Sequence, residues 1–302
     1  GRLLYINSGG SVANSSGMLK FQANAWGGGI FAPTGTSLGA IRLSFTTSTN
    51  NMGINPVGTN PNITIGSLTT DSTAGGTLRG SVTAASNITV SGDVNIQPTT
   101  LTNTGGGFNA VSSADTIKIQ GNYTTLSTAA TQDLMTNGIT GNVLEFNGSS
   151  AQTVTFPTTL TAVTIFTGTK MRVNNSAGVT FTNNDASACT FTLGTGGTYE
   201  GSAGTLSLGA ADVFAYPANA TCTFSGGDIS SANWPTSNGP ANVVFNTSNA
   251  TLPGDRTVSG TLTITNVFVN TGGNTLTLGT SGANLGTLSY TGGGIRGSFK
   301  RW

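Results

Sequence analysis

The segment Val143–Phe156 reads VLEFNGSSAQTVTF, and the segment Met171–Phe181 reads MRVNNSAGVTF. Each contains a short run of alternating apolar and polar residues that ends in Asn-Gly or Asn-Asn, and then a second run that ends in Thr-Phe. Alternation with a period of two is typical of β-strands that bury one face. The equivalent residues Phe146 and Val173 are 27 positions apart, which indicates a structural repeat.

The same short motif occurs upstream of these two copies. Its apolar residue falls at positions 65, 90, 119, 146 and 173, in steps of 25, 29, 27 and 27. One turn of a parallel β-helix, with about three short strands, has this length. We therefore predict an all-β, right-handed parallel β-helix (β-solenoid) with coils of about 25–29 residues. Later copies of the motif centre on Leu193, Leu208 and Leu278.

The repeat divides the chain into two regions. Residues 61–302 are predicted to form the solenoid repeats, whereas residues 1–60 form a less regular β region that we interpret as variant coils. One or two β-sandwiches are the competing fold, because they also contain many short strands separated by turns. Sandwich strands usually place more charge on their solvent face. The few charged residues of this chain therefore favour the solenoid.

Composition excludes several classes of function. Only 7% of the 302 residues are charged, against about 25% in typical domains. The chain has no histidine, so a Ser-His-Asp triad is impossible. A net charge of +1 gives no support for nucleic-acid binding. No apolar run approaches the ~18 residues of a membrane span, and no cofactor is expected.

The carboxylates are scattered along the chain. Asp71, Asp93 and Asp115 are spaced by 22 residues, close to one coil. Three interpretations are open: turn residues, a Ca²⁺-binding ladder, or a catalytic pair brought together from adjacent coils. We favour turn residues, because stacked carboxylates without a metal would repel one another, and we expect no metal or catalytic residues.

Two cysteines lie in matching Cys-Thr-Phe contexts, at Cys189 and Cys222. If these strands stack as neighbours at about 4.8 Å, a disulfide between them is feasible. The alternative is that both are small buried core residues.

One tryptophan is a candidate for binding sugars. Trp234 lies in SANWPTSNG, which has the composition of a loop, and its ring could stack on a glycan. The alternative is that Trp234 covers a corner of a coil.

Several segments resemble a known group of proteins. Val143–Phe156, Met171–Phe181, Gly260–Gly279 (GTLTITNVFVNTGGNTLTLG) and the closing GIRGSFKRW are similar to the β-strand-repeat surface proteins of Bacteroidota, over roughly residues 85–302. The resemblance implies a secreted or cell-surface protein, exported by type IX secretion as part of a larger chain. Asp115-Thr116-Ile117 also resembles a glycosylation site of these bacteria, with Thr116 as the modified residue.

These observations favour an extracellular structural protein without enzymatic activity. We expect a rigid stalk, or a filament subunit whose open ends pair with other copies or with flanking domains. A carbohydrate-binding adhesin that contacts surface glycans is the first alternative. A polysaccharide-cleaving β-helix is the second, and it would require two carboxylates, or a carboxylate with Lys or Arg, converging on one groove.

Overall fold

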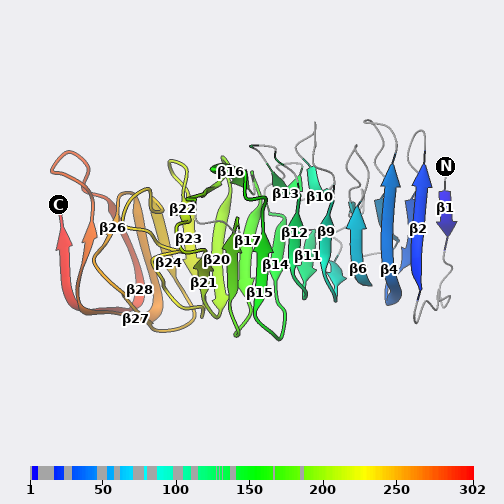
Figure 1. Ribbon diagram of the computed structural model, residues 1–302. Coiled ribbons are helices and arrows are strands. Elements are labelled where there is room, and N and C mark those ends of the chain that lie inside the picture. Colours follow the sequence, from blue (N-terminus) through cyan, green and yellow to red (C-terminus); the bar gives the residue numbers. More distant parts are fainter. Residues whose placement is uncertain are drawn as a thin grey trace.

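The computed structural model is a stack of β-strands, and the described residues contain no helix. These residues are 2–5, 17–23, 29–45, 53–57, 62–70, 78–79, 87–97, 105–109, 115–126, 128, 130, 132–136, 141–165, 167–183 and 187–302. The strands follow one another along one axis between the two ends of the chain (Figure 1). Every pair between them is parallel, so the predicted β-solenoid is confirmed and the β-sandwich is wrong.

The first face of the solenoid runs through most of the chain. Within the described residues, eleven strands pair in succession on this face. They are β4 (Thr36–Phe45), β6 (Asn62–Thr70), β8 (Asn87–Val90), β11 (Thr116–Ile119), β14 (Val143–Phe146), β17 (Lys170–Asn174), β20 (Thr198–Ala203), β23 (Thr221–Phe224), β24 (Asn242–Phe245), β27 (Thr261–Leu278) and β28 (Thr287–Arg301).

The second face begins with β2 (Met18–Ala23), which pairs with the second half of β4. The second half of β6 follows, because both long strands bend from the first face onto the second. The face continues through β9 (Val94–Ile96), β12 (Tyr123–Thr125), β15 (Gln152–Thr155), β18 (Val179–Thr182) and β21 (Leu206–Leu208). Since β2 and β4 belong to the same sheet as the later strands, these parts of residues 1–60 are coils of the solenoid.

The remaining strands form small sheets. Three three-stranded sheets contain β1 (Arg2–Tyr5), β3 (Gly29–Pro33) and β5 (Gly53–Val57); β7 (Leu78–Arg79), β10 (Gly105–Asn109) and β13 (Asp133–Thr136); and β16 (Ala162–Ile165), β19 (Thr190–Leu193) and β22 (Val213–Ala215). We refer to the last of these sheets as the third face. Towards the C-terminus, β25 (Ala250–Thr251) and β26 (Arg256–Val258) each pair with a later stretch of the long strand β27.

The core is built from rows of inward side chains at equivalent positions of successive coils. The five apolar positions that define the repeat form one such row on the first face, and all are fully buried: Ile65, Val90, Ile119, Phe146 and Val173. The strands alternate between buried and half-buried residues, as the period-two pattern predicts. The repeat in the sequence therefore identified the register of the coils.

The coil length differs from the prediction beyond Val173. The same row continues through positions 201, 224, 245, 264 and 290, in steps of 28, 23, 21, 19 and 26. Coils shorten to 19 residues because the third-face sheet ends at β22. The later motif copies do not belong to this row. Leu193 pairs on the third face and Leu208 on the second, while Leu278 lies at the far end of β27, opposite Val258 of β26.

Candidate functional site

A row of charged side chains crosses the outer side of the first face. Lys118, Glu145, Arg172 and Glu200 occupy equivalent positions on β11, β14, β17 and β20. Arg172 Nη1 donates to Glu145 Oε2 at 3.1 Å, and its Nη2 donates to Glu200 Oε2 at 3.2 Å. Lys170 Nζ donates to the same Glu200 oxygen at 2.8 Å. This row is the closest approach of carboxylates and cations among the described residues.

The charges of this row neutralise one another. Burial alone would raise the pKa of Glu200, but the hydrogen bonds and positive charges of Lys170 and Arg172 outweigh it and lower that pKa. Burial likewise opposes the charge of Arg172, yet its pKa is raised by Glu200 and Glu145. Because Arg172 bridges Glu145 and Glu200, the row links three successive coils electrostatically.

A second feature lies where the second and third faces are interrupted. Among the described strands, β21 pairs only with β18, and β22 pairs only with β19. In the next coil, residues 225–241 connect β23 to β24 without forming a strand. The solenoid therefore continues on its first face while strand pairing stops on the other two.

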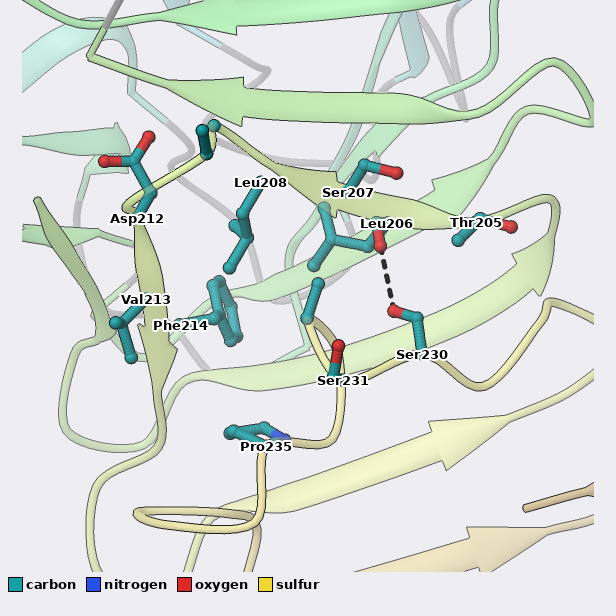
Figure 2. Close-up of a pocket in the computed structure, with 13 residues that line it drawn as sticks. Thr205, Leu206, Ser207, Leu208, Asp212, Val213, Phe214, Ser230, Ser231 and Pro235 are labelled. Atoms are coloured by element: carbon teal, nitrogen blue, oxygen red, sulfur yellow. Dashed lines mark hydrogen bonds between the residues drawn. The ribbon is translucent and has the colours of Figure 1, made fainter. Parts of the chain in front are cut away.

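The interruption leaves a groove of about 460 Å³. The strand side of the groove is lined by Leu206, Leu208, Val213 and Phe214, and the opposite side by residues 230–232 and Pro235. Figure 2 shows β21 and β22 on one side, and Ser231 and Pro235 on the other. Ser230 Oγ donates to the carbonyl of Leu206 at 2.9 Å, so a side chain takes the place of a neighbouring strand here.

The loop that contains residues 230–235 lines the side of the groove opposite the strands, and it also fills the interior of the solenoid. Trp234 is fully buried and lies 6.0 Å from Phe224 and 6.1 Å from Phe245 between ring centroids. The prediction that Trp234 is an exposed glycan contact is therefore wrong. Its indole supplies the apolar volume that inward strand residues supply in other coils, and it is inaccessible to a sugar.

Polar groups accompany Trp234 into the interior. The buried side chain of Asn233 donates to the carbonyl of Asp228 at 2.7 Å and to Tyr199 Oη at 3.3 Å. Tyr216 Oη donates to the carbonyl of Asn233. Burial raises the pKa values of Tyr199 and Tyr216, so both hydroxyls remain protonated donors. The buried side chains of Tyr199, Tyr216 and Asn233 thus each have a hydrogen-bond partner, which fixes the loop in one position.

The two Cys-Thr-Phe segments do not stack as neighbours, which was the condition for a disulfide, and both cysteines are free thiols. Cys222 lies in β23 on the first face, between Tyr199 and Val243. Cys189 directly precedes β19 on the third face, and its carbonyl accepts a hydrogen bond from Val213. Because they belong to different sheets, a shared local sequence did not make them neighbours. Their burial agrees with the alternative, small core residues.

The carboxylates of the turns act as hydrogen-bond acceptors between coils. Asp93 Oδ1 accepts from the backbone N–H of Asn122 at 2.7 Å, and Asp255 Oδ1 accepts from that of Thr275 at 2.7 Å. Both bonds reach from one coil to the next. Within the described residues there is no cluster of three or more metal-binding side chains, and Asp71 lies outside them. These contacts match the turn-residue interpretation.

Thr116 lies half-buried on the outer side of β11, next to the buried Asp115. Strands β8 and β14 flank it, at Asn87 and Val143. Glycosylation of Thr116 stays a prediction.

Sequence reasoning missed the groove, although the sequence contains one signal for it. The spacing of equivalent core positions falls from 28 to 23 and then to 21 residues around residues 201–245. The 21-residue step from Phe224 to Phe245 is the one that contains residues 225–241, which form no strand. The described residues form no helix long and apolar enough to span a membrane. Comparison with protein-family models, with curated proteins and with solved structures finds no match for this chain.

Proposed function

We propose that the chain is a non-catalytic structural protein of the cell surface, a rigid solenoid that serves as a stalk segment or a filament subunit. The observation that carries this proposal is the continuous pairing of eleven strands on the first face. At ~4.8 Å per strand, this stack is about 50 Å long. The extracellular setting is supported by the resemblance of the quoted segments to surface repeats.

Contacts between successive coils explain how such a rod would keep its shape. Backbone hydrogen bonds run along the axis, and the inward rows pack each coil against the next. The side chains of Asn122, Asn242 and Asn249 accept hydrogen bonds from backbone N–H groups of a neighbouring coil. These contacts resist both bending and sliding of coils with few charged residues.

The distribution of charge bears on whether copies stack end to end. Residues 1–70 contain three Lys or Arg and residues 256–302 contain four, whereas all ten carboxylates lie in residues 71–255. End-to-end stacking of two copies would bring two positive ends together. We therefore expect filaments to be favoured by salt. At 0.1 M salt, the repulsion between exposed charges more than about 10 Å apart is largely screened.

Negative-stain electron microscopy of the concentrated protein tests the proposal. Isolated rods of about 50 Å at low salt would support a stalk segment. Fibres that appear on raising the salt, with an axial repeat of one chain, would support a filament subunit. Compact or irregular particles under both conditions would refute a rigid rod.

Glycan binding is the second candidate, because exposed rings lie on the last coil. Tyr290 is 56% and Trp302 46% exposed. Arg296 lies 3.9 Å from the centroid of the Phe268 ring, and Lys300 lies 3.7 Å from that of Trp302. A Tyr290→Ala/Trp302→Ala variant that loses retention on immobilised polysaccharide would support it, and retention equal to that of the parent protein would oppose it.

The charged row of the first face does not favour a polysaccharide-cleaving enzyme. All four carboxylate oxygens of Glu145 and Glu200 accept hydrogen bonds from protein groups. A general acid or a nucleophile needs a carboxylate that can reach the substrate. We interpret the row as a brace between coils.

A further inference from the structure

We propose that the groove between β21, β22 and residues 230–235 binds a short, extended polypeptide segment that carries a lysine or arginine, and that this segment adds as a strand to the free edge of β21. The inference is independent of the proposed structural role, because the groove lies partway along the solenoid and not at its ends.

The backbone of β21 presents unused hydrogen-bonding groups to the groove. On its other side, the carbonyl of Thr205 accepts from Val179 N at 3.0 Å, and Gly209 N donates to the carbonyl of Phe181 at 2.9 Å. In a parallel pair alternate residues bond to opposite sides, so Leu206 and Leu208 face away from β18. The Leu206 carbonyl accepts from Ser230 Oγ, whereas Leu208 has no strand partner on this side in the described structure.

The edge of β22 is arranged in the same way at Phe214, and just beyond the strand Tyr216 N donates to the carbonyl of Asn238 at 2.9 Å. Val213 N donates to the carbonyl of Cys189 at 2.9 Å, towards β19, so Phe214 directs its backbone groups the other way. Two strand edges thus meet at one corner of the groove. Unpaired strand edges are the sites where extended peptides add to a sheet.

The walls limit the occupant to a short segment. The groove has a volume of about 460 Å³, within the range of small-ligand sites. A peptide beside β21 would cover about three residues, or ~10 Å at ~3.3 Å per residue. Phe214 is only 1% exposed, so its ring offers no face for stacking a sugar. Leu208, Val213 and Pro235 instead suit aliphatic side chains.

The surroundings of the groove are acidic. Residues 173–255 contain five carboxylates and no Lys or Arg. Glu200 is neutralised by its ion pairs. Asp212, in the turn between β21 and β22, accepts hydrogen bonds from the backbone N–H groups of Cys189 and Asn183. Asp228 is held by Thr205, which also lines the groove. Within the described part of the chain, neither Asp212 nor Asp228 forms an ion pair, and their negative charges favour a segment with a cationic side chain.

Hydrogen exchange on the whole chain tests the proposal directly. The probe is a blocked peptide, acetyl-Thr-Val-Lys-Val-Thr-amide. The amide of Leu208 is expected to exchange rapidly in the free protein and at least tenfold more slowly when the peptide is saturating. A peptide with Glu in place of Lys is expected to bind more weakly at low salt. A peptide with methylated backbone nitrogens is expected to give no protection, because it cannot pair with a strand edge.

Two wall variants locate the binding. Ser231→Trp places a bulky ring in the groove and is expected to abolish protection. Thr236→Trp, an exposed position of the same loop that does not line the groove, is the matched control and is expected to bind normally. Asp212→Asn keeps an acceptor for Cys189 N and removes the charge, so it is expected to weaken binding about two- to fivefold, with little effect at high salt.

Three results would overturn the proposal. They are no protection of Leu208 at a peptide concentration of about 1 mM, equal binding of the methylated peptide, and equal binding by Ser231→Trp and Thr236→Trp. Protection of Leu208 by a neutral oligosaccharide but not by the peptide would also refute the proposal, and it would indicate that the groove binds a glycan.

Discussion

Replacing Gly204 by alanine should reveal how closely neighbouring coils approach at their turns. Gly204 follows β20 with φ of +68°, and a Cβ at this position would overlap the carbonyl oxygen of Asn175 in the preceding coil. Gly273 offers a matched control, because its φ is +88° and a Cβ there would have no neighbour within 4 Å. Both substitutions carry the conformational cost of a positive φ, and only one of them forces two coils apart.

The difference between the two variants can be estimated. A left-handed conformation costs an alanine about 1–2 kcal/mol, and the stiffer unfolded chain returns ~0.4–1 kcal/mol. We therefore expect Gly273→Ala to lower the free energy of unfolding by about 1 kcal/mol. Gly204→Ala adds an overpacking cost of about 1–3 kcal/mol. It also strains the hydrogen bond from Asn175 N to the carbonyl of Ala203, now 3.2 Å long. The total should reach about 3–4 kcal/mol.

Urea denaturation followed by tryptophan fluorescence can measure this difference. In a background in which Trp26 and Trp302 are replaced by phenylalanine, the buried Trp234 reports on the coil that follows Gly204. The transition of Gly204→Ala should occur at a clearly lower urea concentration than that of Gly273→Ala. If the two variants unfold within about 0.5 kcal/mol of each other, the argument from close stacking of the turns is wrong.

Three further predictions concern the interior and the charged row. Trp234→Ala should lower the free energy of unfolding by about 3–5 kcal/mol, as measured by circular dichroism in urea. Burial, aided by the charge of Asp212, raises the pKa of the Cys189 thiol from 9.0 to about 11. Its contribution to stability is therefore complete below pH 9 and lost as the pH rises to about 11, and alkylation by iodoacetamide should accelerate over the same interval. Arg172→Met should cost about 2–4 kcal/mol, because it leaves two carboxylates without their shared cation. The lowered pKa of Glu200 makes its contribution present above pH 4.5 and lost as the pH falls below it, so acid titration of this variant should show a smaller loss.

The fold and its register were accessible from the sequence because the early coils are regular. Steps of 25–29 residues place Ile65, Val90, Ile119, Phe146 and Val173 in one row, as the pairing confirms. Each such position is occupied by a residue that packs well against its own kind one coil away. Stacking thus imposes on the sequence a pattern that is visible without coordinates.

The candidate sites were less accessible, because they depend on where a segment departs from the pattern. The polar residues around Trp234 suggested a solvent-exposed loop, but Asn233 is hydrogen-bonded inside the solenoid. Its side chain donates to the carbonyl of Asp228 and accepts from Ser230 N, and its own carbonyl accepts from Tyr216 Oη. Cys189 and Cys222 are each followed by Thr-Phe and still lie on different faces, because face assignment depends on the length of every preceding turn. The groove itself is indicated only by a shortened step.

The interruption at β21 and β22 also affects how the solenoid responds to force. In the coils before and after this level, strands on several faces share an applied load. At this level, strand pairing is continuous on the first face alone. A rod resists bending best when paired strands lie on opposite faces. At this level the strands of the second and third faces are replaced by residues 225–241, which contain the buried indole of Trp234. The rod should therefore flex at this level before it flexes elsewhere, with the first face acting as the hinge and the groove opening or closing as the two arms move.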